Sequence, residues 1–257
     1  MEPGDLALLS GLIFIAAALY SSVGHAGASG YIAAMALFGL TPSVMKPTAL
    51  ALNIMVAAFG TYRWRQVGQV RGRLLAPLLV TSIPAAFIGG ALQFPAHWYK
   101  TLVALVLLAA ALKLMLQPRE GSAPALLAAD PATKPAAWPI PWIGGAITGA
   151  LVGLLSGLTG TGGGIFLSPL LLFLGWAGPR QVSGITAPFI LVNSIAGLAG
   201  NLTSLRALPS ELPYLMISAL TGALLGTQMG IAWISGVLLQ RLLGVVLLIA
   251  AGKLLLV

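Results

Sequence analysis

The chain has 257 residues, of which 58% are hydrophobic and only 7% are charged, and its formal net charge is +8. A soluble domain carries about 25% charged residues, because much of its chain must stay in contact with water. The composition therefore excludes a soluble globular protein and indicates that lipid is the solvent. In membrane proteins Lys and Arg gather in cytoplasmic loops, so topology explains the positive charge and we expect no binding to nucleic acid.

Continuous apolar runs dominate the chain. In lipid the backbone must satisfy its own hydrogen bonds, which leaves α-helices or closed β-barrels, and barrel strands alternate apolar and polar residues. The runs here do not alternate, as in residues 102–116, so we expect an all-α, polytopic membrane protein. We predict ten membrane segments. In chain order they are residues 6–23, 30–41, 48–62, 74–93, 101–116, 142–158, 164–177, 185–200, 212–234 and 242–257.

A stretch rich in proline and alanine, residues 117–141, separates the fifth segment from the sixth. We expect it to be an exposed cytoplasmic linker between a first repeat, residues 1–116, and a second repeat, residues 142–257. Each repeat opens with a long segment, which a glycine-rich break and a short segment follow. A Thr-Ala pair and an asparagine come next in both halves. The breaks are 24–30 and 160–164, the pairs begin at Thr48 and Thr186, and the asparagines are Asn53 and Asn193.

Basic residues predict how the two repeats are oriented. The loop after the third segment is rich in arginine and should be cytoplasmic, whereas the equivalent loop of the second half holds one basic residue, Arg206. This asymmetry predicts two inverted structural repeats of about five membrane segments each. The prediction is the same whether the short segments cross the membrane or are broken, re-entrant helices, because the parity of the crossings does not change. The arginines of the first loop are Arg63, Arg65, Arg71 and Arg73.

The two glycine breaks are the candidate binding site. The short segments that follow them would be about 18–21 Å long at about 1.5 Å per residue, less than the roughly 30 Å hydrocarbon core. A helix that begins inside the membrane presents free backbone N–H groups and a partial positive charge, which together bind anions. Glycine lets a ligand approach closely, and hydroxyl groups add donors. The residues expected to contribute are Gly27, Ser29, Gly30, Thr159, Thr161, Gly162, Gly163 and Gly164.

Close helix packing is the alternative use of glycine in membranes. The two uses predict different effects of an added methyl group. Gly163→Ala is expected to weaken ligand binding and to leave folding nearly intact, because a site that faces a cavity has room. Gly153→Ala is expected to lower stability through a clash between helices. We expect packing along two stripes, which are Gly149, Gly153 and Gly157, and Gly222, Gly226 and Gly230.

The scarcity of carboxylates indicates the sign of the substrate. The chain has only five, all at segment ends or in loops, whereas cation transporters and carboxylate proton relays place an acid inside the membrane. Polar residues inside the segments can donate hydrogen bonds, so we predict a small anionic substrate. The alternatives are an ordinary loop charge for the lysine and bonding between helices for the asparagines. The candidate donors are Lys46, Thr48, Asn53, Thr186, Asn193 and Gln228.

His25 lies inside the first break, where it could titrate near physiological pH and couple transport to protons; a hydrogen-bonded structural role is its alternative. With two histidines and no cysteine, the chain offers neither a metal site nor a catalytic triad. We therefore expect no enzyme, no metal and no cofactor. The alternative functions are transport of a neutral or zwitterionic solute and a non-transporting membrane assembly subunit. The sequence indicates neither the direction of transport nor the oligomeric state.

With these motifs the chain resembles the sulfite exporter TauE/SafE family, the toluene sulfonate uptake permease group of bacterial anion permeases. The first break departs from the usual family pattern, because His25, Ala26 and Ala28 stand among its glycines. The resemblance implies a multi-pass protein of the bacterial inner membrane that exports or takes up sulfite, thiosulfate, sulfonates or sulfur-containing organic acids. It rests on the break at 24–30, the run from Thr48 to Asn53, the Tyr-x-Arg-x-x-x-Gly pattern at 62–68, and the second-half break at 157–164 with Pro169 and Thr186.

Overall fold

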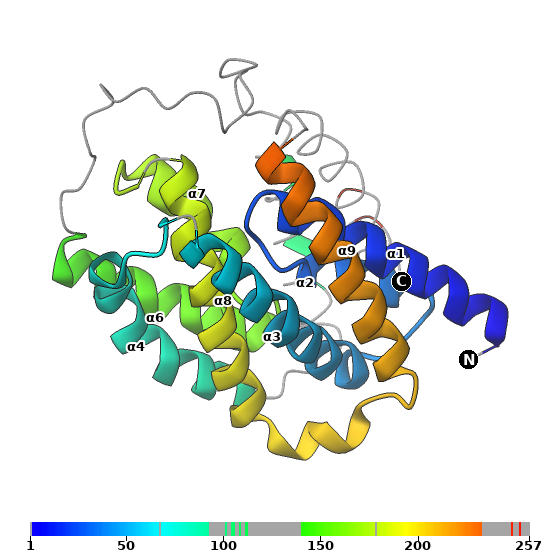
Figure 1. Cartoon of the computed structure of the whole chain (residues 1–257). Coiled ribbons are helices and arrows are strands. Elements are labelled where there is room, and N and C mark those ends of the chain that lie inside the picture. The colour runs from blue at the N-terminus through cyan, green and yellow to red at the C-terminus, as the bar shows by residue number, and fades with distance from the viewer. Residues whose placement is uncertain are drawn as a thin grey trace.

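The computed structural model describes residues 2–66, 68–92, 140–177 and 179–232, together with isolated positions in 101–112 and at 248 and 252. Every regular element of the described part is helical (Figure 1). The predicted fifth and tenth segments and nearly all of the linker lie outside the continuously described ranges. The chain is thus an all-helical, polytopic membrane protein, because five of its helices are long and apolar enough to cross a bilayer.

The described helices follow the same order of lengths in both halves. The first half contains α1 (Pro3–Ser22), the short α2 (Ala28–Leu37), α3 (Pro42–Gln66) and α4 (Gly72–Ala91). The second half contains α6 (Trp142–Thr159), the short α7 (Gly164–Phe173), α8 (Pro179–Gly200) and α9 (Leu212–Ala232), with the 3-10 helix η1 (Leu202–Ala207) before α9. The short helices have 10 residues each.

The prolines that follow the two short helices lie in the long helices α3 and α8. α3 begins at Pro42 and α8 at Pro179, each several residues earlier than predicted, and Pro47 lies inside α3. Proline has no N–H to donate, and the N–H groups of the first helical turn have no partner within the helix. A proline at the start of a helix therefore costs no hydrogen bond, so Pro42 and Pro179 can be the first residues of α3 and α8.

The two glycine breaks share left-handed glycines at two matching positions. Gly24 and Gly27 have φ values of +78° and +104°, and Gly160 and Gly163 have φ values of +74° and +81°. Side chains rarely adopt this left-handed region, which glycine reaches without strain. Each break therefore reverses the chain through the same pair of glycine positions just before a short helix.

Backbone-to-backbone contact along glycine stripes joins the two halves. α6 packs on α4, and a Cβ added at Gly153 would lie 2.4 Å from the carbonyl oxygen of Ser82. The reciprocal pair, α9 on α1, has the same contact, since a Cβ at Gly226 would lie 2.0 Å from the carbonyl oxygen of Ala18. The packing expected for the stripes is confirmed at Gly149, Gly153, Gly157, Gly222 and Gly226. The surroundings of Gly230 lie outside the described part of the structure.

The equivalent helices α3 and α8 pack on each other at the centre of the bundle (Figure 1). Asn53 of α3 lies beside Ser194 of α8, with 3.5 Å between Nδ2 and Oγ. Further along α3, a Cβ at Gly60 would lie 3.7 Å from the Cβ of Ala187. Residue numbers rise along one helix as they fall along the other, so α3 and α8 run antiparallel.

Gly153→Ala tests this packing. The new methyl group would meet the Ser82 backbone, which cannot move without shifting α4, so we expect a loss of about 1–3 kcal/mol in stability, the usual cost of overpacking. The control is Gly11→Ala in α1, where an added Cβ meets nothing within 4 Å. Thermal unfolding in detergent should show a lower melting temperature for Gly153→Ala alone. Equal melting temperatures for the two variants would contradict the close approach of α4 and α6.

Candidate functional site

The two glycine breaks meet around one small cavity in the interior. The first break contributes residues 25–29, and the second contributes Thr161, Gly164 and Ile165. Tyr20 of α1 and Ile190 of α8 complete the lining. Of the residues predicted for the site, the structure brings together His25, Gly27, Ser29, Thr161 and Gly164.

The N-terminal ends of α2 and α7 both face this cavity. α7 begins level with the middle of α8, because a Cβ at Gly164 would lie 2.4 Å from Ile190 Cδ1. It then runs back along α8, and Ser168 Oγ lies 3.0 Å from Thr186 Oγ1. α7 is therefore a half-length helix that starts inside the bundle, and the first-turn N–H groups that have no partner within the helix lie there.

The cavity has a volume of about 10 Å³. A single buried water needs roughly 10–15 Å³, so the cavity has no space for a polyatomic ion. No residue that lines it in the described part of the chain carries a carboxylate. The structure thus shows a centre that is too narrow for an ion and that has two helix N-termini in its wall.

Two buried tyrosines fill the first break, and sequence analysis did not identify them. The Tyr20 hydroxyl is hydrogen-bonded to Ser29 Oγ, and the Tyr31 hydroxyl donates to the Ala26 carbonyl. At the spacing that relates the glycines of the two breaks, their counterparts are Ser156 and Leu167. Because neither counterpart is aromatic, the two half-sites are not equivalent.

His25 connects the first break to the second half of the chain. Its Nε2 lies 2.8 Å from Ser168 Oγ on α7, and Ser168 in turn contacts Thr186 on α8. Its Nδ1 lies 3.2 Å from the Val23 carbonyl oxygen. A carbonyl can only accept, so Nδ1 carries a proton and Nε2 of a neutral ring accepts from Ser168. This predicted residue therefore has the hydrogen-bonded position that we gave as its alternative role.

Asn53 and Asn193 each donate a hydrogen bond from the side-chain amide nitrogen to a backbone carbonyl, and their amide oxygens accept none in the described part of the chain. Asn53 Nδ2 donates to the Thr161 carbonyl at 3.2 Å, and Asn193 Nδ2 donates to the Phe189 carbonyl at 2.8 Å. In the described part of the chain, the Oδ1 atoms of both residues and the hydroxyl of Thr48 are buried without a hydrogen-bond partner. The amide nitrogens that we expected to serve a substrate thus already donate within the protein, while the buried Thr48 hydroxyl is still able to donate.

Several predicted residues support the breaks without lining the cavity. Thr159 Oγ1 donates to the Leu155 carbonyl at 2.7 Å and contacts Thr161 Oγ1 at 2.8 Å. Gly30 packs against Ala16 of α1, and Gly162 packs against Asn53. Gln228 is exposed on α9 and is not part of the lining.

The room that we expected around Gly163 does not exist. A Cβ at this position would lie 3.0 Å from the Phe189 ring, 3.1 Å from Val152 and 3.2 Å from Ser156. Its φ of +81° also disfavours any side chain. Gly163→Ala would therefore disturb folding as well as any ligand, and it cannot separate binding from packing.

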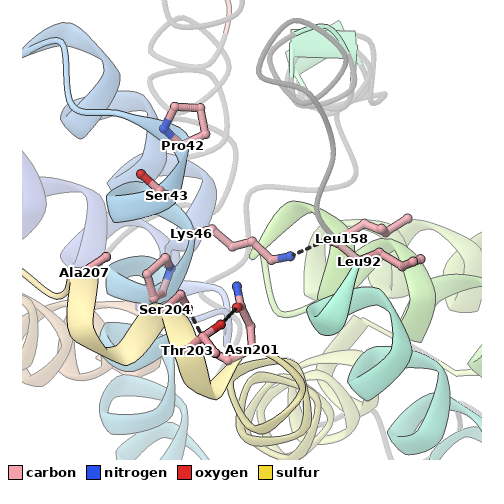
Figure 2. Close-up of a pocket in the computed structure, with 10 residues that line it drawn as sticks. Pro42, Ser43, Lys46, Leu92, Leu158, Asn201, Thr203, Ser204 and Ala207 are labelled. Carbon is pink, nitrogen blue, oxygen red and sulfur yellow. Dashed lines mark hydrogen bonds between the residues drawn. The ribbon is translucent and has the colours of Figure 1, made fainter.

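Lys46 lies in a second and larger cavity, which we call the vestibule (Figure 2). The vestibule has a volume of about 350 Å³ and lies where α3 begins and where α4 and α6 end. The Lys46 side chain is 7% exposed, and its Nζ donates to the carbonyls of Gly90 at 3.1 Å and Gly89 at 3.3 Å. A Cβ on Gly160, the first residue of the second break, would lie 3.0 Å from Lys46 Cγ. Lys46 therefore lies between the vestibule and the second break.

Comparison with known proteins agrees with this architecture. The model of the sulfite exporter TauE/SafE family matches residues 9–254. A protein of Sinorhizobium fredii described as a probable membrane transporter is 40% identical over 242 residues, which cover 94% of this chain and 95% of that protein. No solved structure matches the chain.

Proposed function

This chain belongs to the sulfite exporter TauE/SafE family, and we propose that it carries a small anion, sulfite or another sulfur-containing or organic anion, across the bacterial inner membrane. The family and the relative make it a membrane transporter, and they favour this role over an enzymatic one. One observation supports an anionic substrate. The N-terminal ends of α2 and α7, one from each half, line the same interior cavity, and no carboxylate is among its described lining residues.

The helix ends supply charge where the anion would bind. Each helix N-terminus acts as roughly +0.5 of an elementary charge within its first turn, so each of the two ends attracts an anion. Their backbone N–H groups are fixed donors, and Gly164 carries no side chain that would keep a ligand away from them. The cavity must widen before an ion enters, so the structure corresponds to a state in which the centre is closed.

The unpaired Asn53 Oδ1 favours a second class of substrate. Asn53 is bonded to Thr161, which lines the cavity, so an acceptor lies beside the anion site. A zwitterion such as an aminosulfonate would place its anionic end at the helix ends and its ammonium on this oxygen. The zwitterionic alternative from the sequence therefore uses the same site.

We further propose that residues 1–116 and 142–257 are inverted repeats joined by a cytoplasmic linker. Support comes from the antiparallel packing of the equivalent helices α3 and α8. In this arrangement the arginine-rich loop between α3 and α4 is cytoplasmic, and the vestibule opens to the outside. The two halves would move against each other about the contact of α3 and α8, exposing the centre to either side in turn.

Proton coupling would act through His25. A neutral ring accepts the Ser168 hydrogen at Nε2, whereas a charged ring donates there and forces the Ser168 hydroxyl to turn towards Thr186. Protonation thus reverses a chain of hydrogen bonds that joins the first break to α7 and α8. The cavity that His25 lines would gain positive charge at the same time and hold an anion more tightly.

Ala28→Asp tests the sign of the substrate. This residue is the first of α2 and lines the cavity, so a fixed carboxylate there would occupy the place of the anion. The control is Ala28→Asn, which has nearly the same size and no charge. We expect the Asp variant to bind radioactive sulfite at least about tenfold more weakly than the Asn variant, the effect of a unit charge at short range. Equal affinities in two variants of equal melting temperature would refute the anion site.

Cysteine labelling tests the inverted repeats. The chain has no cysteine, so single cysteines at Gln69 and Ser204 are the sole targets of a membrane-impermeant thiol reagent. We expect Gln69→Cys to react from the cytoplasmic side and Ser204→Cys from outside, because these loops follow equivalent helices of opposite direction. Labelling of both positions from the same side would rule out inversion.

A further inference from the structure

The vestibule holds the buried ammonium group of Lys46. No residue that lines it in the described part of the chain is Asp or Glu. The Lys46 ammonium has three carbonyl contacts, at 3.1, 3.3 and 3.5 Å, and two of these exceed the usual range of about 2.7–3.2 Å for N–H···O bonds. These long contacts hold the ammonium group loosely. Burying an ammonium group costs several kcal/mol unless it is well paired, so Lys46 would gain from a better partner.

Four helices have an end at the vestibule. α3 begins there, and α4, α6 and α8 end there, so their partial charges of about ±0.5 sum to about −1. These partial charges are spread over several backbone carbonyls, whereas Lys46 concentrates a full positive charge on one ammonium group. Lys46 is the charged side chain among the described lining residues, and an anion in the vestibule would be attracted to it.

Polar groups surround the same space. The hydroxyls of Thr203 and Ser204 line it but already donate to Asn201, whereas Ser43 adds a third hydroxyl and Figure 2 shows the amide nitrogen of Asn201 turned towards Lys46. Asn201 Oδ1 already accepts from Thr203 Oγ1 at 3.3 Å, so its amide group presents donors to the cavity. A volume of about 350 Å³ accommodates a sulfonate-sized anion with some of its water.

We propose that the vestibule is a second anion-binding site, in which Lys46 exchanges its α4 carbonyl partners for the oxygens of an oxyanion such as a sulfonate. This inference rests on the proposed function, since it gives the transported anion a holding place before the centre. Lys46 also lies against Gly160, so its movement towards a bound anion would release contact with the second break. Binding in the vestibule would thereby loosen the break that leads to the central cavity.

The competing role for Lys46 is a purely structural cap on α4. If the α4 carbonyls cancel the charge of Lys46, as a structural cap requires, the vestibule has little positive potential, whereas an anion ligand requires that potential to reach the cavity. Ser204→Cys reports this potential, because position 204 lines the vestibule and the chain has no other cysteine. The readout is the ratio of the labelling rates with two methanethiosulfonates of similar size, one anionic and one cationic.

We expect the anionic reagent to react faster with Ser204→Cys, and this preference to fall about tenfold when Lys46→Met is added. Lys46→Gln keeps a donor for the α4 carbonyls, so it separates loss of charge from loss of the cap. The matched control is Arg206→Met, which removes an exposed charge from η1 that does not line the vestibule. An unchanged ratio in both Lys46 variants, or an equal fall in Arg206→Met, would overturn the proposal.

Protection by an inert anion completes the test. Sodium methanesulfonate should slow the labelling of Ser204→Cys in a saturable way, beyond the effect of sodium chloride at equal ionic strength. This protection should vanish in Lys46→Gln and persist in Ala28→Asp, because the two sites are separate. Protection lost in Ala28→Asp, or absent from the parent, would contradict a vestibule site. Failure of the central site alone would instead appear as equal sulfite binding in the two Ala28 variants.

Discussion

A backbone polar group inside a bilayer must find its partner within the protein, and the whole arrangement depends on this constraint. α2 and α7 begin in the interior, where their first N–H groups have no partner within the helix. Two features reduce the cost of placing these N–H groups in the interior. The left-handed glycines turn the chain, and the stripes of α6 and α9 bring backbones so close that the breaks are enclosed by protein. What remains at the junction is a pair of positive helix ends, which becomes useful once an anion occupies it.

The two halves share a backbone plan but differ in the side chains at the breaks. In the first half, Tyr20 and Tyr31 fill the space and bond to their own break, while the corresponding Ser156 hydroxyl is buried without a partner in the described part of the chain. His25 lines the central cavity, whereas Lys46 lies in the vestibule beside the second break. A transporter needs such a difference between its two sides, because opening towards one side must break contacts that opening towards the other leaves intact.

Local sequence patterns predicted the long helices and both glycine breaks, because apolar runs and glycine clusters act over a few residues. The predicted starts of α3 and α8 were several residues too late. Pro42 and Pro179 suit a first helical turn as well as a loop, so the sequence does not decide between the two. Contacts between distant segments could not be read from the chain. The crowding of Gly163 by Phe189 depends on how α8 packs at the second break, and the use of the Asn53 amide on Thr161 depends on how α3 packs there. Ser168 was overlooked for the same reason, because nothing near it in sequence indicates His25.

The central claim is that one anion binds between the N-terminal ends of α2 and α7. Selenite has the charge and shape of sulfite, and its selenium scatters X-rays anomalously. Crystals grown with selenite would therefore locate the ion directly. We predict an anomalous peak bounded by Ala28, Ser29 and Gly164, with the cavity widened around it. A peak confined to the vestibule, or no peak at saturating selenite, would contradict the claim.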